Sequence, residues 1–214
     1  MASPAEIAAL RQRVLGILRS RACLDIAFTI EGRTVMGYGY GYVADMIEQG
    51  GVAIRIGDTG SFDAVYRMSS VSKAMVFKAT DSPRNATPDM RATIVHEATH
   101  AVIDAVAKGH SVNYLGNECA AYIAQTVYSL NRGDKINRVG PLSGPLVQIA
   151  ERIRANSGPA VYVCAASELA AIKPTILQVY QAIAKARSEP VPDAATSEMM
   201  TGLRPPGPVM IADP

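Results

Sequence analysis

The run of residues 94–106, IVHEATHAVIDAV, places the strongest constraint on how this chain can fold. Most of it is alanine, valine and isoleucine, and a helix that is apolar nearly all round is a buried helix. Four ionisable side chains interrupt it: His96, Glu97, His100 and Asp104. Burying an ionisable group without a partner costs several kcal/mol. The sequence therefore predicts that these side chains are paired, neutral or bound to a metal ion.

The two histidines of this segment are four residues apart. In a helix, side chains at that spacing lie about 40° apart on one face, so His96 and His100 can converge on a single ion. A tetrahedral zinc ion, with Zn–N distances of about 2.0–2.1 Å, suits such a pair. Glu97 points about 100° away around the helix and can reach a water molecule on the ion. The chain has only 3 histidines, so chance rarely produces this His-Glu-x-x-His pattern.

A catalytic zinc ion normally has three protein ligands, so the two histidines need a third partner. Glu118 is the sole carboxylate between residues 109 and 131, in a segment rich in alanine, isoleucine, valine and tyrosine. A lone carboxylate on an apolar helix faces the same cost of burial as the histidines, and one metal ion resolves both. His110 is a weaker candidate because it follows Gly109, where the first helix is expected to end.

These residues resemble the gluzincins, zinc metallopeptidases with His-Glu-x-x-His on one helix and a glutamate ligand on the next. The resemblance rests on residues 96–100 and on Asn117-Glu118, and it covers the 45 residues 87–131. It implies a zincin-like domain in which a strand or hairpin precedes the active-site helix. It also implies that His96, His100 and Glu118 bind Zn²⁺ and that the substrate is a peptide or protein.

The resemblance further implies catalytic roles. Glu97 is the expected general base, which takes a proton from the zinc-bound water and returns it to the leaving amine. A second donor has to stabilise the oxyanion, and Tyr114, Tyr122 and His110 are open candidates. Thermolysin-like gluzincins place an aspartate, hydrogen-bonded to a zinc-bound histidine, where this chain has Tyr122. We expect Asp104 to supply that orienting carboxylate instead.

Each assignment has a plainer alternative. The histidines can form a polar seam in a buried helix, and Glu118 can be an acidic residue at a helix N-terminus that Asn117 caps. Asp104 can be an ordinary residue near a helix end, and the tyrosines can be packing residues. Another alternative keeps the metal: the two histidines and Glu118 form a structural or regulatory zinc site in a non-catalytic protein. Glu97 favours the peptidase, because a structural site does not need it and usually has four ligands rich in cysteine.

Periodicity predicts an α+β fold with a small mixed or antiparallel sheet first and a mainly helical C-terminal half. A hairpin with a serine-rich turn, residues 62–78, is expected before the helix that Thr87 caps, Pro88 begins and Lys108 ends. Other strands are expected at 23–30, 33–42 and 52–57, and other helices at 4–20, 43–51, 117–130, 145–155 and 167–188. Within 33–42, the alternating tyrosines of GYGYGY suggest one face of a strand.

Composition limits the other functions. Hydrophobic residues make up 49% of the 214 residues, which suffices for one core, and the net charge of +2 gives no indication of a nucleic-acid partner. No apolar run reaches the roughly 18 residues of a membrane span. Cys23, Cys119 and Cys164 are far apart and odd in number, so we expect free thiols in a reducing compartment.

The expected location is the cytoplasm, because the first residues contain no signal-peptide pattern, although export without a cleaved signal is an alternative. We expect a single domain over residues 1–188, followed by a proline-rich tail at 189–214. That tail is expected to be disordered. The alternative is that its apolar segment GPVMIADP lies in the substrate cleft and blocks it.

Overall fold

The structure, a computed structural model, describes residues 2–60, 62–68, 72–78, 87–107, 114–134, 143–156 and 160–186. Its helices are α1 (Pro4–Leu18), α2 (Arg21–Leu24), α3 (Gly37–Glu48), α4 (Pro88–Ala107), α5 (Tyr114–Arg132), α6 (Ser143–Ala155) and α7 (Ala166–Ala186). Its strands are β1 (Ala27–Ile30), β2 (Arg33–Met36), β3 (Ala53–Gly57), β4 (Ala64–Met68), β5 (Lys73–Lys78) and β6 (Tyr162–Val163). The predicted α+β class and the mainly helical second half are confirmed.

The described strands form two small sheets. In the first, β1 pairs antiparallel with β2 and parallel with β6. In the second, β5 lies between β3, with which it is parallel, and β4, with which it is antiparallel. The β4–β5 pair is the predicted hairpin, with Ala64 opposite Phe77 and Met68 opposite Lys73. Among the described strands, β4 pairs only with β5 and so lies at an edge of this sheet.

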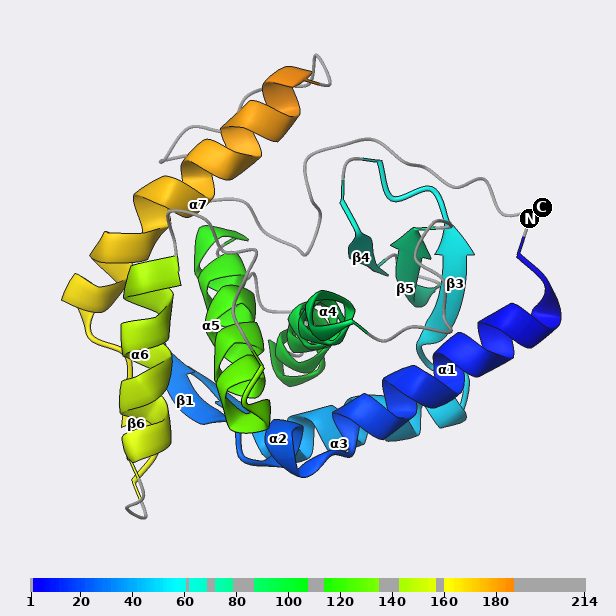
Figure 1. Cartoon of the computed structure of the whole chain (residues 1–214), viewed down its shortest axis with the longest axis horizontal. Coiled ribbons are helices and arrows are strands. Elements are labelled where there is room, and N and C mark those ends of the chain that lie inside the picture. Colours follow the sequence, from blue (N-terminus) through cyan, green and yellow to red (C-terminus); the bar gives the residue numbers. More distant parts are fainter. Residues whose placement is uncertain are drawn as a thin grey trace.

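Helix α4 occupies the centre of the fold. Figure 1 shows it nearly end-on, between the β3-β5-β4 sheet on one side and α5, α6 and α7 on the other. The helix begins as predicted: the backbone N–H of Met90 donates to Thr87 Oγ1 at 3.2 Å, and Pro88 is the first helical residue. Ile94, Val95 and Ala98 are completely buried. The apolar composition of the segment therefore corresponds to a helix with neighbours on several sides, namely α1, α3, α5 and β4.

A single hydrophobic core connects most of the described elements. It extends from Leu10 of α1 to Tyr180 of α7 and includes buried residues of α3, α4, α5 and α6. Cys23, Cys119 and Cys164 are buried, free cysteines, as predicted. Within the described segments, no helix has both the length and the hydropathy needed to cross a membrane. The tail at 189–214 and His110 lie outside the described residues.

The strand prediction for GYGYGY is wrong. Residues 37–42 form the first half of α3, and only 33–36 of the predicted strand are extended. Tyr40 is completely buried whereas Tyr38 and Tyr42 are 73% and 56% exposed, so the tyrosines do not share one face. The buried positions 37, 40, 43, 44 and 47 follow the helical spacing instead. Tertiary packing of this apolar face outweighs the low helix propensity of glycine.

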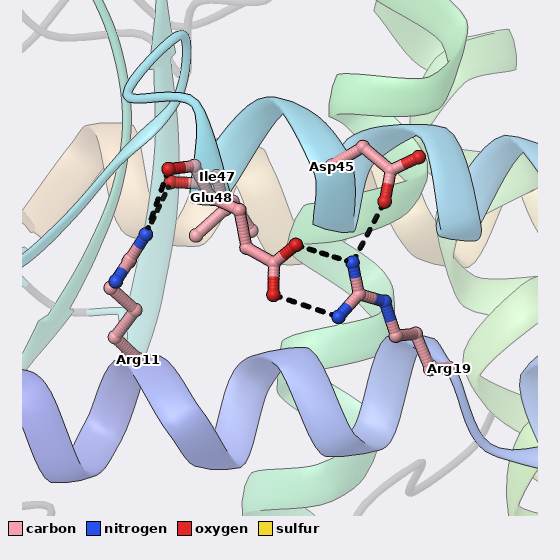
Figure 2. Close-up of polar contacts among 5 residues, drawn as sticks. All are labelled: Arg11, Arg19, Asp45, Ile47 and Glu48. Carbon is pink, nitrogen blue, oxygen red and sulfur yellow. Dashed lines mark hydrogen bonds and ion pairs between the residues drawn. The ribbon is translucent and has the colours of Figure 1, made fainter.

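Polar contacts hold α1 against α3 (Figure 2). Arg19 forms two hydrogen bonds with the Glu48 carboxylate, at 2.8 and 2.7 Å, and one with Asp45 at 2.7 Å. Arg11 donates to the backbone carbonyls of Ile47 and Glu48, both at 3.1 Å. These carbonyls lie at the C-terminal end of α3, where a helix leaves acceptors unpaired and favours positive charge.

Smaller differences occur at other element boundaries. The strand expected from residue 23 begins at Ala27, because residues 21–24 form the short helix α2. Helix α5 begins at Tyr114, three residues before the predicted start at Asn117. The short strand β6 was not predicted, since two residues are too few to produce a periodic pattern. None of these changes alters which helices carry the candidate ligands.

Candidate metal centre

The three predicted metal ligands come together between α4 and α5. His96 and His100 project from α4, and Glu118 projects from the first turns of α5. The two imidazole rings lie 4.9 Å apart between centroids. One ligand atom from each of the three residues lies within 4.8 Å of the others, and all three side chains are buried. The three polar side chains for which the sequence predicts costly burial therefore lie together at one place.

The separations between these atoms fit a metal site. His96 Nε2 lies 3.3 Å from Glu118 Oε2, and His100 Nε2 lies 3.5 Å from Glu118 Oε1. Two ligands on a tetrahedral zinc ion with bonds of about 2.0–2.1 Å are about 3.3–3.4 Å apart. A direct bond between a charged imidazole and a carboxylate is shorter, about 2.7–2.9 Å. These separations are therefore compatible with an ion bound between the three side chains.

The side chain of Gln125 selects the ring nitrogen that His96 directs at Glu118. His96 Nδ1 lies 3.0 Å from Gln125 Oε1, an acceptor, so the proton of the neutral ring belongs on Nδ1. This leaves the lone pair of Nε2 facing the carboxylate, an arrangement that requires a cation or a proton between them. Gln125 lies two turns after Glu118 on α5, and the sequence analysis did not identify it.

Glu118 is buried and surrounded by donors. Burial by itself raises the pKa of this carboxyl group, but the electrostatic effect of the adjacent His100 and His96 side chains and the hydrogen bonds to Glu118 outweigh it, so its pKa is lowered. One of those bonds comes from Tyr180 of α7, whose hydroxyl donates to Glu118 Oε2 at 2.6 Å. Glu118 is therefore held as a carboxylate, the protonation state that binds a metal ion.

Glu97 occupies a different position beside the same three ligands. Its carboxylate accepts a hydrogen bond from the backbone N–H of Tyr66 in β4, and only 6% of the residue is exposed. Burial raises the pKa of Glu97 to about 7, against the opposing effect of the nearby charge of His100. A carboxyl group with a pKa near neutrality can both accept and release a proton.

A cavity opens onto the ligands and onto Glu97. Its volume is about 210 Å³. Strand β4 contributes Ala64, Val65 and Tyr66 to the lining, and α5 contributes Tyr114 and Tyr122. The cavity is the space in which a small part of a substrate can meet the ligand cluster.

The two tyrosines proposed from the sequence both line this cavity. The ring of Tyr122 lies edge-on to His96, 4.8 Å between centroids, and Tyr114 packs against Tyr180. Burial raises the pKa of both hydroxyl groups, so each stays protonated and remains a donor at neutral pH. The tyrosine hydroxyl of residue 114 is buried without a hydrogen-bond partner in the described part of the chain.

Asp104 does not orient a histidine. Its carboxylate accepts a hydrogen bond from Tyr66 at 2.8 Å and pairs with Lys73 at 2.7 Å, and so ties α4 to the β4–β5 hairpin. His100 Nδ1, which Asp104 was expected to contact, has no hydrogen-bond partner among the described residues. The prediction fails because one further helical turn places Asp104 at the hairpin, beyond reach of the imidazole. Gln125, on the neighbouring helix, orients His96 instead.

Comparison of the chain with models of protein families, with curated protein sequences and with solved structures gives no match. The inference of function therefore depends on the geometry of this site.

Proposed function

We propose that the protein is a zinc-dependent metallopeptidase with a zincin-like, gluzincin-type site, in which His96, His100 and Glu118 bind the ion. The separations of 3.3 and 3.5 Å between the histidine nitrogens and the Glu118 oxygens carry the proposal. Two histidines and a glutamate are a ligand set of catalytic zinc and leave the fourth position open. A zinc ion in such a site activates a bound water molecule and polarises the substrate carbonyl.

Glu97 is the general base of the proposed reaction. It takes a proton from the attacking water and delivers it to the nitrogen of the leaving amine. Two observations support this role: Glu97 lines the same cavity as the three ligands, and its pKa is raised to about 7. The hydrogen bond from the Tyr66 backbone fixes the carboxylate at the edge of that cavity. Tyr114 and Tyr122 are the candidate donors for the oxyanion.

A peptide or protein is the proposed substrate. Strand β4 is an edge strand, and Ala64, Val65 and Tyr66 place its backbone along the cavity. An extended peptide can add to such an edge through main-chain hydrogen bonds. That placement brings a peptide carbonyl beside the ligand cluster and Glu97.

The alternative function is a structural or regulatory metal site in a non-catalytic protein. Structural zinc sites normally have four protein ligands, often cysteines. Within the described residues, the group that can hold an ion contains only His96, His100 and Glu118. This ligand count, together with Glu97 at the same cavity, favours the peptidase.

Metal analysis tests whether His96, His100 and Glu118 bind zinc. Protein purified without added zinc is expected to contain about one zinc per chain, because the three buried donors fit that ion. His100→Ala removes one of the three ligands and is expected to lose the metal. Equal metal content in the two proteins, or a wild type that cannot be loaded, contradicts the site.

Replacement of Glu97 by glutamine distinguishes the proposed peptidase from a non-catalytic metal site. Glu97→Gln keeps the side-chain volume and removes the base, so we expect the hydrolysis rate to fall by a factor of about 10²–10⁴. Zinc content is expected to be unchanged, because Glu97 is not a ligand. The measurement is hydrolysis of a mixed peptide library by zinc-loaded protein, with zinc-free protein as the blank. Hydrolysis at the wild-type rate by Glu97→Gln contradicts the catalytic role.

A further inference from the structure

Helix α7 reaches the metal centre through one side chain. Tyr180 donates its hydroxyl to Glu118 Oε2 at 2.6 Å, across 62 residues of sequence. Both residues are buried, with 4% and 5% of their surfaces exposed. A hydroxyl–carboxylate bond of this length, away from water, is among the stronger hydrogen bonds in proteins.

Packing determines where the Tyr180 hydroxyl lies. The ring stacks at a tilt on Phe62, 6.0 Å between centroids, and edge-on to Tyr114, 5.3 Å between centroids. Phe62 precedes β4 and Tyr114 begins α5, so elements on two sides of the site confine the ring. The hydroxyl is therefore presented to Glu118 by the packing of α7, with little freedom to turn away.

The two oxygens of Glu118 consequently have different surroundings. Oε2 accepts the hydrogen bond from Tyr180 and lies 3.3 Å from His96 Nε2, whereas Oε1 lies 3.5 Å from His100 Nε2. We propose that Tyr180 is a positioning residue, which holds the Glu118 carboxylate in the orientation that places Oε2 beside His96 and Oε1 beside His100. The inference rests on the proposed metal site.

Zinc affinity tests this inference without any substrate. Tyr180→Phe keeps the ring and removes only the hydroxyl, and loss of such an orienting bond typically lowers metal affinity 10–100-fold. The affinity is measured by competition with a chromophoric chelator. The matched control is Tyr162→Phe, which removes a tyrosine–glutamate hydrogen bond of 2.7 Å to Glu168, away from the metal centre. The control is expected to bind zinc as the wild type does.

The visible spectrum of the cobalt-loaded protein tests the geometry. If Tyr180 sets the orientation of the Glu118 carboxylate, Tyr180→Phe changes how that carboxylate meets the ion, and the visible absorption of the bound cobalt differs from that of the wild type. This measurement is made at saturating cobalt and also applies if the metal-free variant is unfolded, since binding and folding are coupled.

The outcomes separate this inference from the proposal of a metal site. A wild type that binds neither zinc nor cobalt contradicts the metal site itself. A wild type that binds zinc, with equal affinity in Tyr180→Phe, contradicts only the role of Tyr180. Reduced affinity with an unchanged cobalt spectrum also contradicts it, because the hydroxyl then does not set the orientation of the carboxylate.

Discussion

Glu97 and Glu118 are both buried glutamates beside the same two histidines, yet their pKa values move in opposite directions. Glu118 lies between both imidazoles and accepts the Tyr180 hydrogen bond, and its pKa is lowered. Glu97 has a single backbone donor, and burial raises its pKa to about 7. Two carboxyl groups whose environments separate their pKa values are suited to different roles, here the proposed metal ligand and the proposed general base.

The raised pKa of Glu97 predicts a pH-dependent stability of the metal-free protein. The folded pKa of about 7 exceeds the ordinary 4.5, so the folded state binds more protons between these values and stability falls as pH rises through that window. Glu97→Gln removes this cost. We expect it to gain on the order of 1–3 kcal/mol over wild type between pH 5 and pH 8.

Urea denaturation of the metal-free proteins at a series of pH values measures this difference. The control is Glu151→Gln, because Glu151 is exposed on α6 and its replacement is expected to leave the pH dependence unchanged. A constant difference between wild type and Glu97→Gln over this range contradicts a raised pKa.

The three candidate ligands were predictable from the sequence, whereas most of the residues that contact them were not. His96 and His100 are one helical turn apart, and Glu118 is conspicuous as a carboxylate on an apolar helix. Gln125 and Tyr180 carry no such signal, because an amide or a tyrosine on an amphipathic helix is ordinary. Tyr180 joins the site only through the packing of α7, which local periodicity does not encode.

At the scale of elements, the hairpin and α4 were predicted because each has a complete local pattern. The β4–β5 hairpin has two largely apolar arms on either side of a serine-rich segment, and α4 has both a capping threonine and an N-terminal proline. Residues 37–42 misled the prediction because glycine at alternate positions imitates a strand. Close packing of the two helices explains the glycine at position 39, because a Cβ on Gly39 would lie 2.7 Å from Val102 of α4.

A pair of alanine substitutions in α3 tests this explanation. Gly39→Ala is expected to lower the free energy of unfolding by about 1–3 kcal/mol, because the β-branched Val102 cannot rotate away from the added methyl group. Gly41→Ala is the matched control. No heavy atom lies within 4 Å of its added Cβ, so higher helix propensity is expected to raise stability by about 0.5–1 kcal/mol. Urea denaturation measures both, and shifts of the same sign contradict the close contact of α3 with α4.

At the scale of the molecule, the proposed ion lies where three helices from separate parts of the sequence meet. His96 and His100 belong to α4, Glu118 to α5, and Tyr180 to α7, and α4 also contacts β4 and α3 (Figure 1). An ion at this point binds the folded chain and has no preformed site in the unfolded one, so binding adds to the stability of the whole core. A bound ion also compensates the charge of the buried His96, His100 and Glu118 side chains, so this polar cluster is compatible with an otherwise apolar centre.

Removal of the metal is therefore expected to lower the melting temperature of the whole protein in one transition. A free zinc concentration of 100 times the dissociation constant stabilises by about 2.7 kcal/mol, which for a chain of this size is about 5–10 °C. Thermal denaturation followed by circular dichroism, with buffered zinc or with a chelator, measures the shift. His100→Ala is expected to melt at the same temperature in both conditions, whereas Glu97→Gln keeps the shift because it retains all three ligands. A wild type with equal melting temperatures in zinc and in chelator contradicts an ion at the junction of α4, α5 and α7.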